Sequence, residues 1–211
     1  MRVETRTKTP CFNYLRQFAD EKITNIFACD KTPVIIYCDV KSMHTYNIQY
    51  GYSKGDELLC MISKGLERQF TDSIVTRGIS DHFIVIDEFD NEEQIAKKID
   101  KVNSEVRSNA YGNTSGIRVG VCKMSLGMSP VEAMDYARHA LKYFDKESDI
   151  VCHFYSREKD DKYWNEKFIK DSFDSALENG YIRVFYQPIL RTENSKITIL
   201  EALARWIDPE K

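Results

Sequence analysis

The chain has 211 residues, of which 42% are hydrophobic and 30% charged, a globular composition long enough for one domain or for one domain and part of another. Its net charge of −3 provides no basic surface for nucleic acid or for an acidic membrane, so we expect neither as a partner. No apolar run approaches the roughly 20 residues of a membrane helix, and no signal peptide precedes Met1, so we expect a cytoplasmic protein.

The first two elements that we predict are a helix over residues 4–19, entered through Pro10, and a strand at Val34–Tyr37. The strand is a continuous run of β-branched and aromatic residues, which is typical of a buried central strand. It ends at Asp39, and open α/β-type sheets usually place their chemistry at this edge of a strand. Asp39 is therefore the first candidate for a functional residue.

A second helix is predicted to begin near Gly55, with Asp56 close to its N-cap, because two glycines and an acid precede an apolar-periodic segment. After it, two β-rich runs at about 73–77 and 82–87 predict strands. The residues between them, 78–81, predict a tight turn that joins the strands into a hairpin.

The rest of the first domain alternates between helical and strand patterns. The predicted elements are a helix at 92–106, a strand at 116–122, a helix from Ser129 to Phe144 and a strand at 150–155. The order β-α-α-β-β-α-β-α-β is typical of an α+β fold in which helices cover the faces of one sheet. The six cysteines are scattered without a CxxC pair, so we expect free thiols and neither zinc ligands nor disulfides.

The last third of the chain changes character. A charge-rich helix is predicted over 160–179, stopped by Asn179-Gly180, and two strands follow at 182–189 and 197–203 around a polar turn. We interpret the helix as a linker to a second domain. The expected domain ranges are 1–157, 158–180 and 181–211.

The segment that follows the first predicted strand matches the pattern D-x-D-x-F-K-x-x-N-D-x-x-G-H-x-x-G-D-x-x-L at six positions. The matching residues are Asp39, Asn47, Gly51, Gly55, Asp56 and Leu59. This stretch resembles the first half of a GGDEF domain, the family of diguanylate cyclases that join two GTP molecules into cyclic di-GMP. The resemblance implies a mostly antiparallel central sheet flanked by helices. It also implies that Asp39 binds metal and that Asn47 and Asp56 hydrogen-bond the guanine.

The motif that names this family falls on the predicted hairpin, as Ile79-Ser80-Asp81-His82-Phe83. Both glycines are replaced, Asp81 keeps the first acid as a metal position, and His82 stands where the family has a second carboxylate. The resemblance therefore implies a degenerate active site in which no catalytic residue is expected.

Other positions of the family motif are also changed. The lysine that holds phosphate falls on His44, and the two cations that grip the terminal phosphates fall on Asp145 and Asp149. Anions at these two positions would repel a triphosphate. The product-inhibition motif R-x-x-D falls on Phe70 and Ser73, so we do not expect feedback binding of cyclic di-GMP.

The two final strands resemble the opening of an EAL domain, the family of cyclic di-GMP phosphodiesterases on a TIM-type barrel. The matching residues are Tyr186-Gln187-Pro188-Ile189, then Glu201-Ala202-Leu203, then Arg205-Trp206. The resemblance implies that Glu201 binds one of two catalytic metals, Mg²⁺ or Mn²⁺ in a complete domain, while Gln187 and Arg205 contact cyclic di-GMP. Such a barrel needs on the order of 250 residues, so we expect a truncated start that neither hydrolyses cyclic di-GMP nor holds a metal.

Three hypotheses remain open at this point. The first is a catalytically silent GGDEF-like regulatory domain of a tandem GGDEF-EAL protein, and it is favoured over an active diguanylate cyclase. The second is an allosteric module that binds a guanine nucleotide weakly through Asn47 and Asp56. The third is a dimerisation scaffold without a ligand, and the sequence leaves a homodimer open.

Overall fold

A computed structural model describes residues 10, 12–143, 151–191 and 197–207 of the chain. It divides into two compact units, residues 1–160 and residues 161–211, and each is described by itself. None of the described helices is long and apolar enough to cross a membrane.

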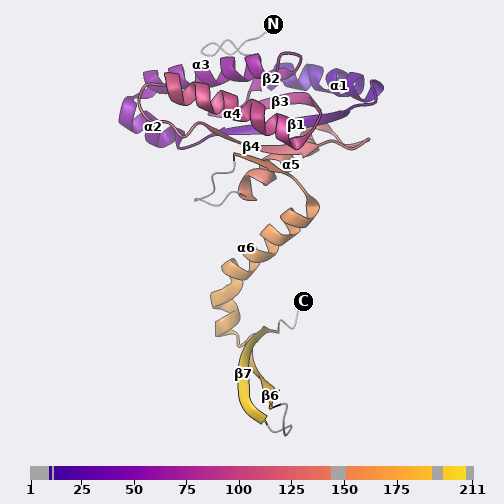
Figure 1. Ribbon diagram of the computed structural model, residues 1–211, viewed down its shortest axis with the longest axis vertical. Helices are drawn as coiled ribbons and strands as arrows, with labels where there is room; N and C mark the ends of the chain where they lie inside the picture. The colour runs from indigo at the N-terminus through magenta and orange to yellow at the C-terminus, as the bar shows by residue number, and fades with distance from the viewer. Residues whose placement is uncertain (1–9, 11, 144–150, 192–196, 208–211) are drawn as a thin grey trace. The chain divides into compact units, whose positions relative to one another are not determined.

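The first unit is an α+β domain built around one sheet (Figure 1). Its elements in chain order are α1 (Phe12–Ala28), β1 (Thr32–Val40), α2 (Met43–Tyr50), α3 (Tyr52–Gln69), β2 (Ile74–Arg77), β3 (His82–Phe89), α4 (Glu92–Asn109), β4 (Ile117–Lys123), α5 (Pro130–Ala140), a 3₁₀ turn (Leu141–Tyr143) and β5 (Cys152–Phe154). The order of elements after α1 is the one that the sequence predicts.

The sheet has the strand order β2-β3-β1-β4-β5, with β1 at its centre. All strand pairs are antiparallel except β4 and β5, which run parallel. The prediction of a mostly antiparallel sheet flanked by helices is therefore confirmed.

Both faces of β1 are covered, as its uninterrupted apolar run predicts. Val34 and Ile36 belong to one buried cluster with α2, α3 and α4, whereas Ile35 and Tyr37 face a second cluster with α1 and α5. Successive side chains of a strand point to opposite faces, so a strand between two helical layers needs apolar residues at every position.

The predicted bounds of α1 and the predicted start of α3 were wrong. The first helix spans Phe12–Ala28 instead of 4–19, and residues 4–9 and 11 lie outside the described part. The helix expected near Gly55 begins at Tyr52, with Gly51 as its N-cap at a φ of 85°. That left-handed conformation favours glycine and allows α2 to end and α3 to begin at one residue. Asp56 lies inside α3 and not near its N-cap.

The start of α5 follows the prediction closely. Ser129 is the N-cap, its hydroxyl accepts a hydrogen bond from the Glu132 backbone at 3.2 Å, and Pro130 opens the helix. The helix ends at Ala140 and continues as a 3₁₀ turn instead of reaching Phe144. Residues 144–150 lie outside the described part, so the strand expected over 150–155 is observed only as β5.

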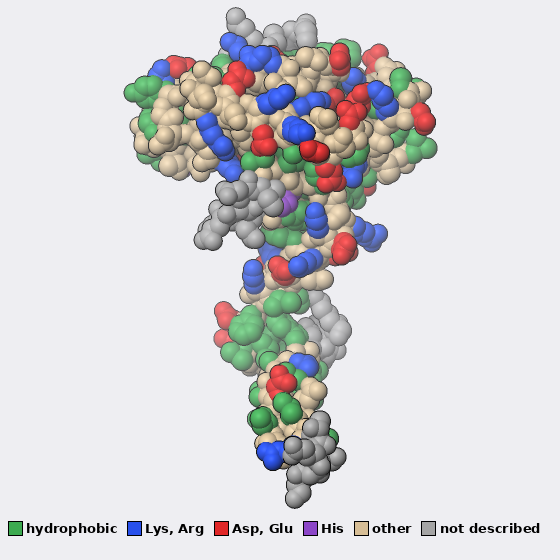
Figure 2. All heavy atoms as spheres, in the orientation of Figure 1, with side chains coloured by type: hydrophobic (Ala, Val, Ile, Leu, Met, Phe, Trp, Pro, Cys, Tyr) green, Lys and Arg blue, Asp and Glu red, His purple; other side chains and the backbone are tan. Residues whose placement is uncertain are grey.

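The second unit contains most of α6 (Arg157–Glu178) and the antiparallel pair β6 (Ile182–Leu190) and β7 (Ile197–Trp206). Gly180 has a φ of 67°, and the Tyr181 N–H donates to the Ala176 carbonyl at 2.8 Å. This is a Schellman ending and confirms the predicted stop at Asn179-Gly180. Apolar side chains are exposed along both strands, and Figure 2 shows hydrophobic side chains on the surface of this unit.

Candidate functional site

Three polar side chains form a row across the end of the central sheet. Asp39 of β1 stands opposite His82 of β3 and opposite Arg118 of β4 in the strand register. The Arg118 Nε lies 2.7 Å from one carboxylate oxygen of Asp39, and the His82 Nε2 lies 3.4 Å from the other. We call His82, Asp39 and Arg118 the Asp39 row. Both oxygens of Asp39 therefore have a nitrogen neighbour supplied by the protein.

The hairpin between β2 and β3 fixes the position of His82. The Gly78 N–H donates to the His82 carbonyl at 2.8 Å, and Ser80 adopts a φ of 64°. The Arg77 guanidinium also donates to the Ser80 carbonyl at 3.0 Å. A serine thus adopts a left-handed conformation at a position where the family motif has a glycine.

The hydrogen bonds of the His82 ring indicate which nitrogen carries a proton. The Nδ1 lies 2.9 Å from the Ile79 carbonyl oxygen, which can only accept, so Nδ1 is the donor in this pair. The approach of Nε2 to Asp39 is then attractive when the imidazole is protonated on both nitrogens. In that state Asp39 lies between two cations.

Asp39, Asp81 and His82 each offer one ligand atom within 4.8 Å of the others, so the sequence-predicted metal positions Asp39 and Asp81 do come together. The set nevertheless fits a divalent cation poorly. Mg²⁺ prefers oxygen ligands in octahedral geometry, whereas His82 supplies a nitrogen and the guanidinium of Arg118 shares the Asp39 carboxylate. Two carboxylates and one guanidinium leave one net negative charge to face a dication.

A small cavity of about 150 Å³ lies beside the Asp39 row, between the hairpin and α5. Tyr37 and Arg138 are among its lining residues, and the Tyr37 ring packs 5.2 Å from the His82 ring. Burial raises the pKa of Tyr37 above its usual value, so its hydroxyl stays protonated and neutral at physiological pH. The cavity is smaller than most ligand pockets.

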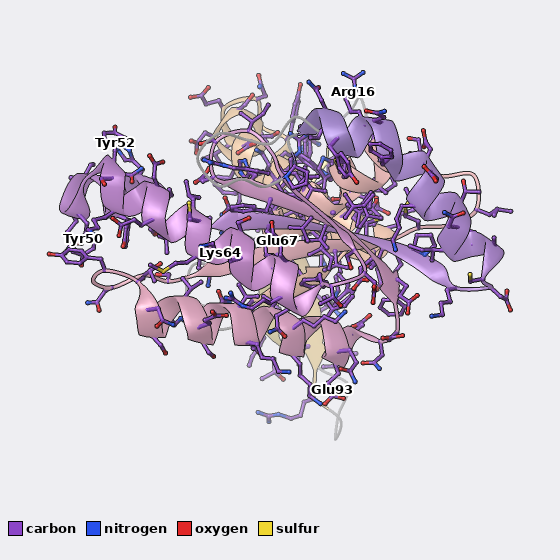
Figure 3. The ribbon with its side chains drawn as sticks, turned by 90° about the horizontal axis from the view of Figure 1, so that it is seen from above. Arg16, Tyr50, Tyr52, Lys64, Glu67 and Glu93 are labelled. Carbon is purple, nitrogen blue, oxygen red and sulfur yellow. The ribbon has the colours of Figure 1, made fainter. Side chains whose placement is uncertain are left out.

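The predicted base-binding residues lie at the junction of α2 and α3, which Tyr50 and Tyr52 mark in Figure 3. The Asn47 side chain packs against Gly55, where a Cβ atom would overlap with its amide oxygen. That oxygen is buried and has no hydrogen-bond partner among the described residues. Asp56 follows Gly55 and is half-buried. The structure therefore brings Asn47 to the turn of α3 that carries Asp56.

Other sequence-predicted positions have distinct outcomes. His44 is exposed on α2, at the position expected to hold phosphate. Asp145 and Asp149 lie outside the described residues. Phe70, at the position of the product-inhibition arginine, is buried. The Ser73 hydroxyl donates to Asp87 at 2.7 Å, so this position is engaged inside the domain.

The EAL-like residues of the second unit share one face of the β6–β7 pair. Gln187 and Glu201 are direct cross-strand partners, and Arg205 follows Glu201 by four residues. Residues at even spacing on a strand point the same way. All three are exposed, and in the described part of the chain Glu201 belongs to no group of three potential metal ligands.

The family model for the GGDEF domain of diguanylate cyclases matches residues 5–148, which is more than half of the chain. The chain belongs to the GGDEF family. Its GGDEF domain resembles the isolated GGDEF domain of YfiN (TpbB) from Pseudomonas aeruginosa, with a TM-score of 0.67 and 13% identity over 78% of this chain and 99% of that one.

Two other similarities extend beyond the GGDEF domain. The S helix-GGDEF-EAL segment of LapD from Vibrio cholerae, bound to c-di-GMP, gives a TM-score of 0.61 and 14% identity over 98% of this chain and 49% of that one. The cyclic di-GMP phosphodiesterase NbdA of Pseudomonas aeruginosa is 25% identical over 181 residues, 83% of this chain and 23% of that protein. The chain spans about a quarter of the length of the curated relatives that it matches.

Sequence reasoning missed Arg118 of this GGDEF domain. A signal was present, because Arg118 is the one charged residue within the apolar strand that the sequence predicts at 116–122. Its partner could not be inferred, since Asp39 lies 79 residues away. The pairing depends on the register of β1 and β4, which no local pattern reveals.

Proposed function

We propose that this GGDEF domain, which belongs to cyclic di-GMP signalling, is catalytically silent and serves a regulatory role in a tandem GGDEF-EAL protein. The observation that carries this proposal is the Asp39 row. The carboxylate that would bind metal in a cyclase has Arg118 on one oxygen and His82 on the other.

The chemistry of cyclisation explains why this arrangement favours a domain without cyclase activity. Divalent metals neutralise the phosphates and help to generate the attacking alkoxide, and a carboxylate at the second acid of the motif would assist. His82 stands at that acid, and the guanidinium of Arg118 can donate hydrogen bonds but has no open coordination position for a hydroxyl. The hairpin also carries Ile79 and Ser80 where glycines let the backbone approach a nucleotide.

A turnover assay tests the silent state. The chain is incubated with GTP and Mg²⁺ or Mn²⁺, an active diguanylate cyclase serves as the positive control, and the products are separated by chromatography. We expect GTP to remain unconsumed, and accumulation of cyclic di-GMP would refute the proposal.

The second part of the proposal is that β6 and β7 open an EAL domain. Three observations support it: Gln187, Glu201 and Arg205 share one face, apolar side chains are exposed on both faces, and the similarity to the LapD segment covers 98% of the chain. Strands of a TIM-type barrel are covered on both faces. In a complete domain Glu201 would hold Mg²⁺ or Mn²⁺.

Cyclic di-GMP hydrolysis by the full-length protein tests this second part. We expect hydrolysis that depends on Mg²⁺ or Mn²⁺ and that is lost in the Glu201→Ala variant. Unchanged hydrolysis in that variant would overturn the role of Glu201, and hydrolysis by the present chain alone would overturn the need for the rest of the barrel.

A second candidate function is an allosteric site for a guanine nucleotide. The position of Asn47 against the turn that carries Asp56 favours it. Isothermal titration of the unaltered chain and of the Asp56→Ala variant with GTP, GDP and GMP tests this function. We expect heat of binding for the unaltered chain and none for the variant. The absence of heat with all three nucleotides would favour the ligand-free dimerisation scaffold instead.

A further inference from the structure

We propose that Arg118 is the resident cation of this site: its guanidinium takes the place of a divalent metal at Asp39, so the domain binds no metal there. The inference rests on the proposed function in that it explains the silent state of the same site. It also implies a regulatory property: the affinity of this site for a ligand would not depend on the concentration of divalent metal.

The backbone holds Arg118 next to Asp39. The two residues are direct partners in the β1–β4 ladder, which continues with the pair Val40 and Ile117. The Lys41 N–H then donates to the Gly116 carbonyl at 2.9 Å. Direct cross-strand partners have Cβ atoms about 5 Å apart, so the guanidinium can reach the carboxylate without any change in the backbone.

The contact between Arg118 and Asp39 is a strong type of hydrogen bond. The Arg118 Nε lies 2.7 Å from the Asp39 Oδ2, within the range of charge-assisted hydrogen bonds. The Asp39 side chain is 16% exposed, so water screens this pair less than it screens a surface pair. A metal that used the same oxygen would have to share it with the guanidinium.

The other oxygen of Asp39 offers a metal little more. His82 Nε2 lies 3.4 Å from Oδ1, and its second ring nitrogen is committed to the Ile79 carbonyl. A metal between Asp39, Asp81 and His82 would therefore share the Asp39 carboxylate with a fixed positive charge. Three ligand atoms lie close together, but the guanidinium compensates half of the negative charge that would attract a dication.

Mn²⁺ titration followed by electron paramagnetic resonance tests the inference with Mn²⁺ alone as the probe. We compare the unaltered chain with Arg118→Gln, which removes the charge at similar size, and with Arg118→Lys, which keeps the charge. The unaltered chain and R118K should show no saturable binding. R118Q should gain a saturable Mn²⁺ site, at least about 10-fold tighter than any residual binding by the unaltered chain, and Asp39→Asn in the R118Q background should remove it.

Saturable Mn²⁺ binding by the unaltered chain that is lost in Asp39→Asn would overturn the inference, and this arm does not depend on the folding of R118Q. A folded R118Q chain, judged by circular dichroism, that gains no site would also overturn it. Turnover of GTP would refute the silent state, whereas Mn²⁺ binding without turnover would refute only the role of Arg118.

Discussion

Lys98 of α4 donates a hydrogen bond to the buried carboxylate of Asp87 in β3, with 2.8 Å between Nζ and Oδ2. The Ser73 hydroxyl donates to the other oxygen of Asp87 at 2.7 Å. The Lys98 ammonium also lies 4.7 Å from the centre of the Phe70 ring. The resemblance assigns Phe70 and Ser73 to the positions of the product-inhibition motif, and in this structure both side chains contact this internal network.

The Asp87→Ala substitution should lower the free energy of unfolding by about 2 to 4 kcal/mol, because it leaves Ser73 and Lys98 without their buried partner. Urea unfolding measures this change. The control is Lys97→Ala, which removes the exposed Lys97–Glu93 pair and should cost no more than about 0.5 kcal/mol. Equal effects of the two substitutions would show that the network does not stabilise the domain.

Gly120 allows α5 to approach the sheet. A Cβ atom at Gly120 would overlap with the backbone oxygen of Ala137 in α5, and a helix backbone cannot move as a side chain can. Gly120→Ala should therefore cost about 3 kcal/mol or more.

The matched control for Gly120→Ala is Gly65→Ala in α3. Its new Cβ would lie 3.2 Å from a methyl group of Val102, which can give slightly, and alanine favours a helix over glycine by up to about 1 kcal/mol. Gly65→Ala should be close to neutral in urea unfolding. A ranking in which Gly65→Ala costs more would contradict the close contact of α5 and β4.

Two buried thiols, Cys38 and Cys122, and the half-buried thiol of Cys152 should make the stability of the protein fall at alkaline pH. Burial raises the pKa of Cys122 to about 11 and that of Cys152 to about 12, and it also raises the pKa of Cys38. An unfolded thiol ionises near pH 8.5. Above that pH the folded state keeps protons that the unfolded state loses, so the free energy of unfolding falls by up to about 1.4 kcal/mol per pH unit and thiol. The thiol contribution is fully present below about pH 8.5.

Urea unfolding between about pH 7 and pH 10 measures this alkaline slope. A variant with alanine at Cys38, Cys122 and Cys152 should show a shallower dependence on pH than the unaltered chain. Identical slopes would mean that these thiols are not protected from ionisation in the folded state.

The first unit should fold without the second. Both buried apolar clusters, with the residues packed against them, lie between Phe12 and Tyr155. A chain shortened to residues 1–160 keeps Asp160, which accepts a hydrogen bond from Tyr143 at 3.2 Å. Its Tm should stay within about 3 °C of the first transition of the full chain, the shift for about 1 kcal/mol in a domain of this size. A shortened chain without a cooperative transition would contradict two independent units.

The strands β1 and β3 could be predicted because they lie between two helical layers and carry apolar residues, many of them β-branched, on both faces. The helix α2 could not be bounded in the same way. Ser42, which precedes it, has a φ of 57° and makes no capping hydrogen bond with its side chain, and only Met43 and Tyr46 are buried within it. No start signal and no clear apolar stripe therefore mark this helix in the sequence.

The candidate site was only partly predictable. Asp39, Asp81 and His82 could be placed together because a family motif spans the hairpin, and the structure brings them within 4.8 Å. Arg118 could not be assigned to the site from the sequence, because only the pairing of β1 with β4 brings it next to Asp39. The left-handed conformation of Ser80, with a φ of 64°, could not be predicted either, because non-glycine residues rarely adopt it.

The most direct test of the account is a crystal structure of this chain grown with a non-hydrolysable GTP analogue and Mn²⁺, with anomalous scattering recorded for manganese. The account predicts that the Arg118 guanidinium remains on Asp39 and that no anomalous peak appears between Asp39 and Asp81. A manganese peak at that place, with Arg118 displaced and the triphosphate bound to the metal, would contradict it.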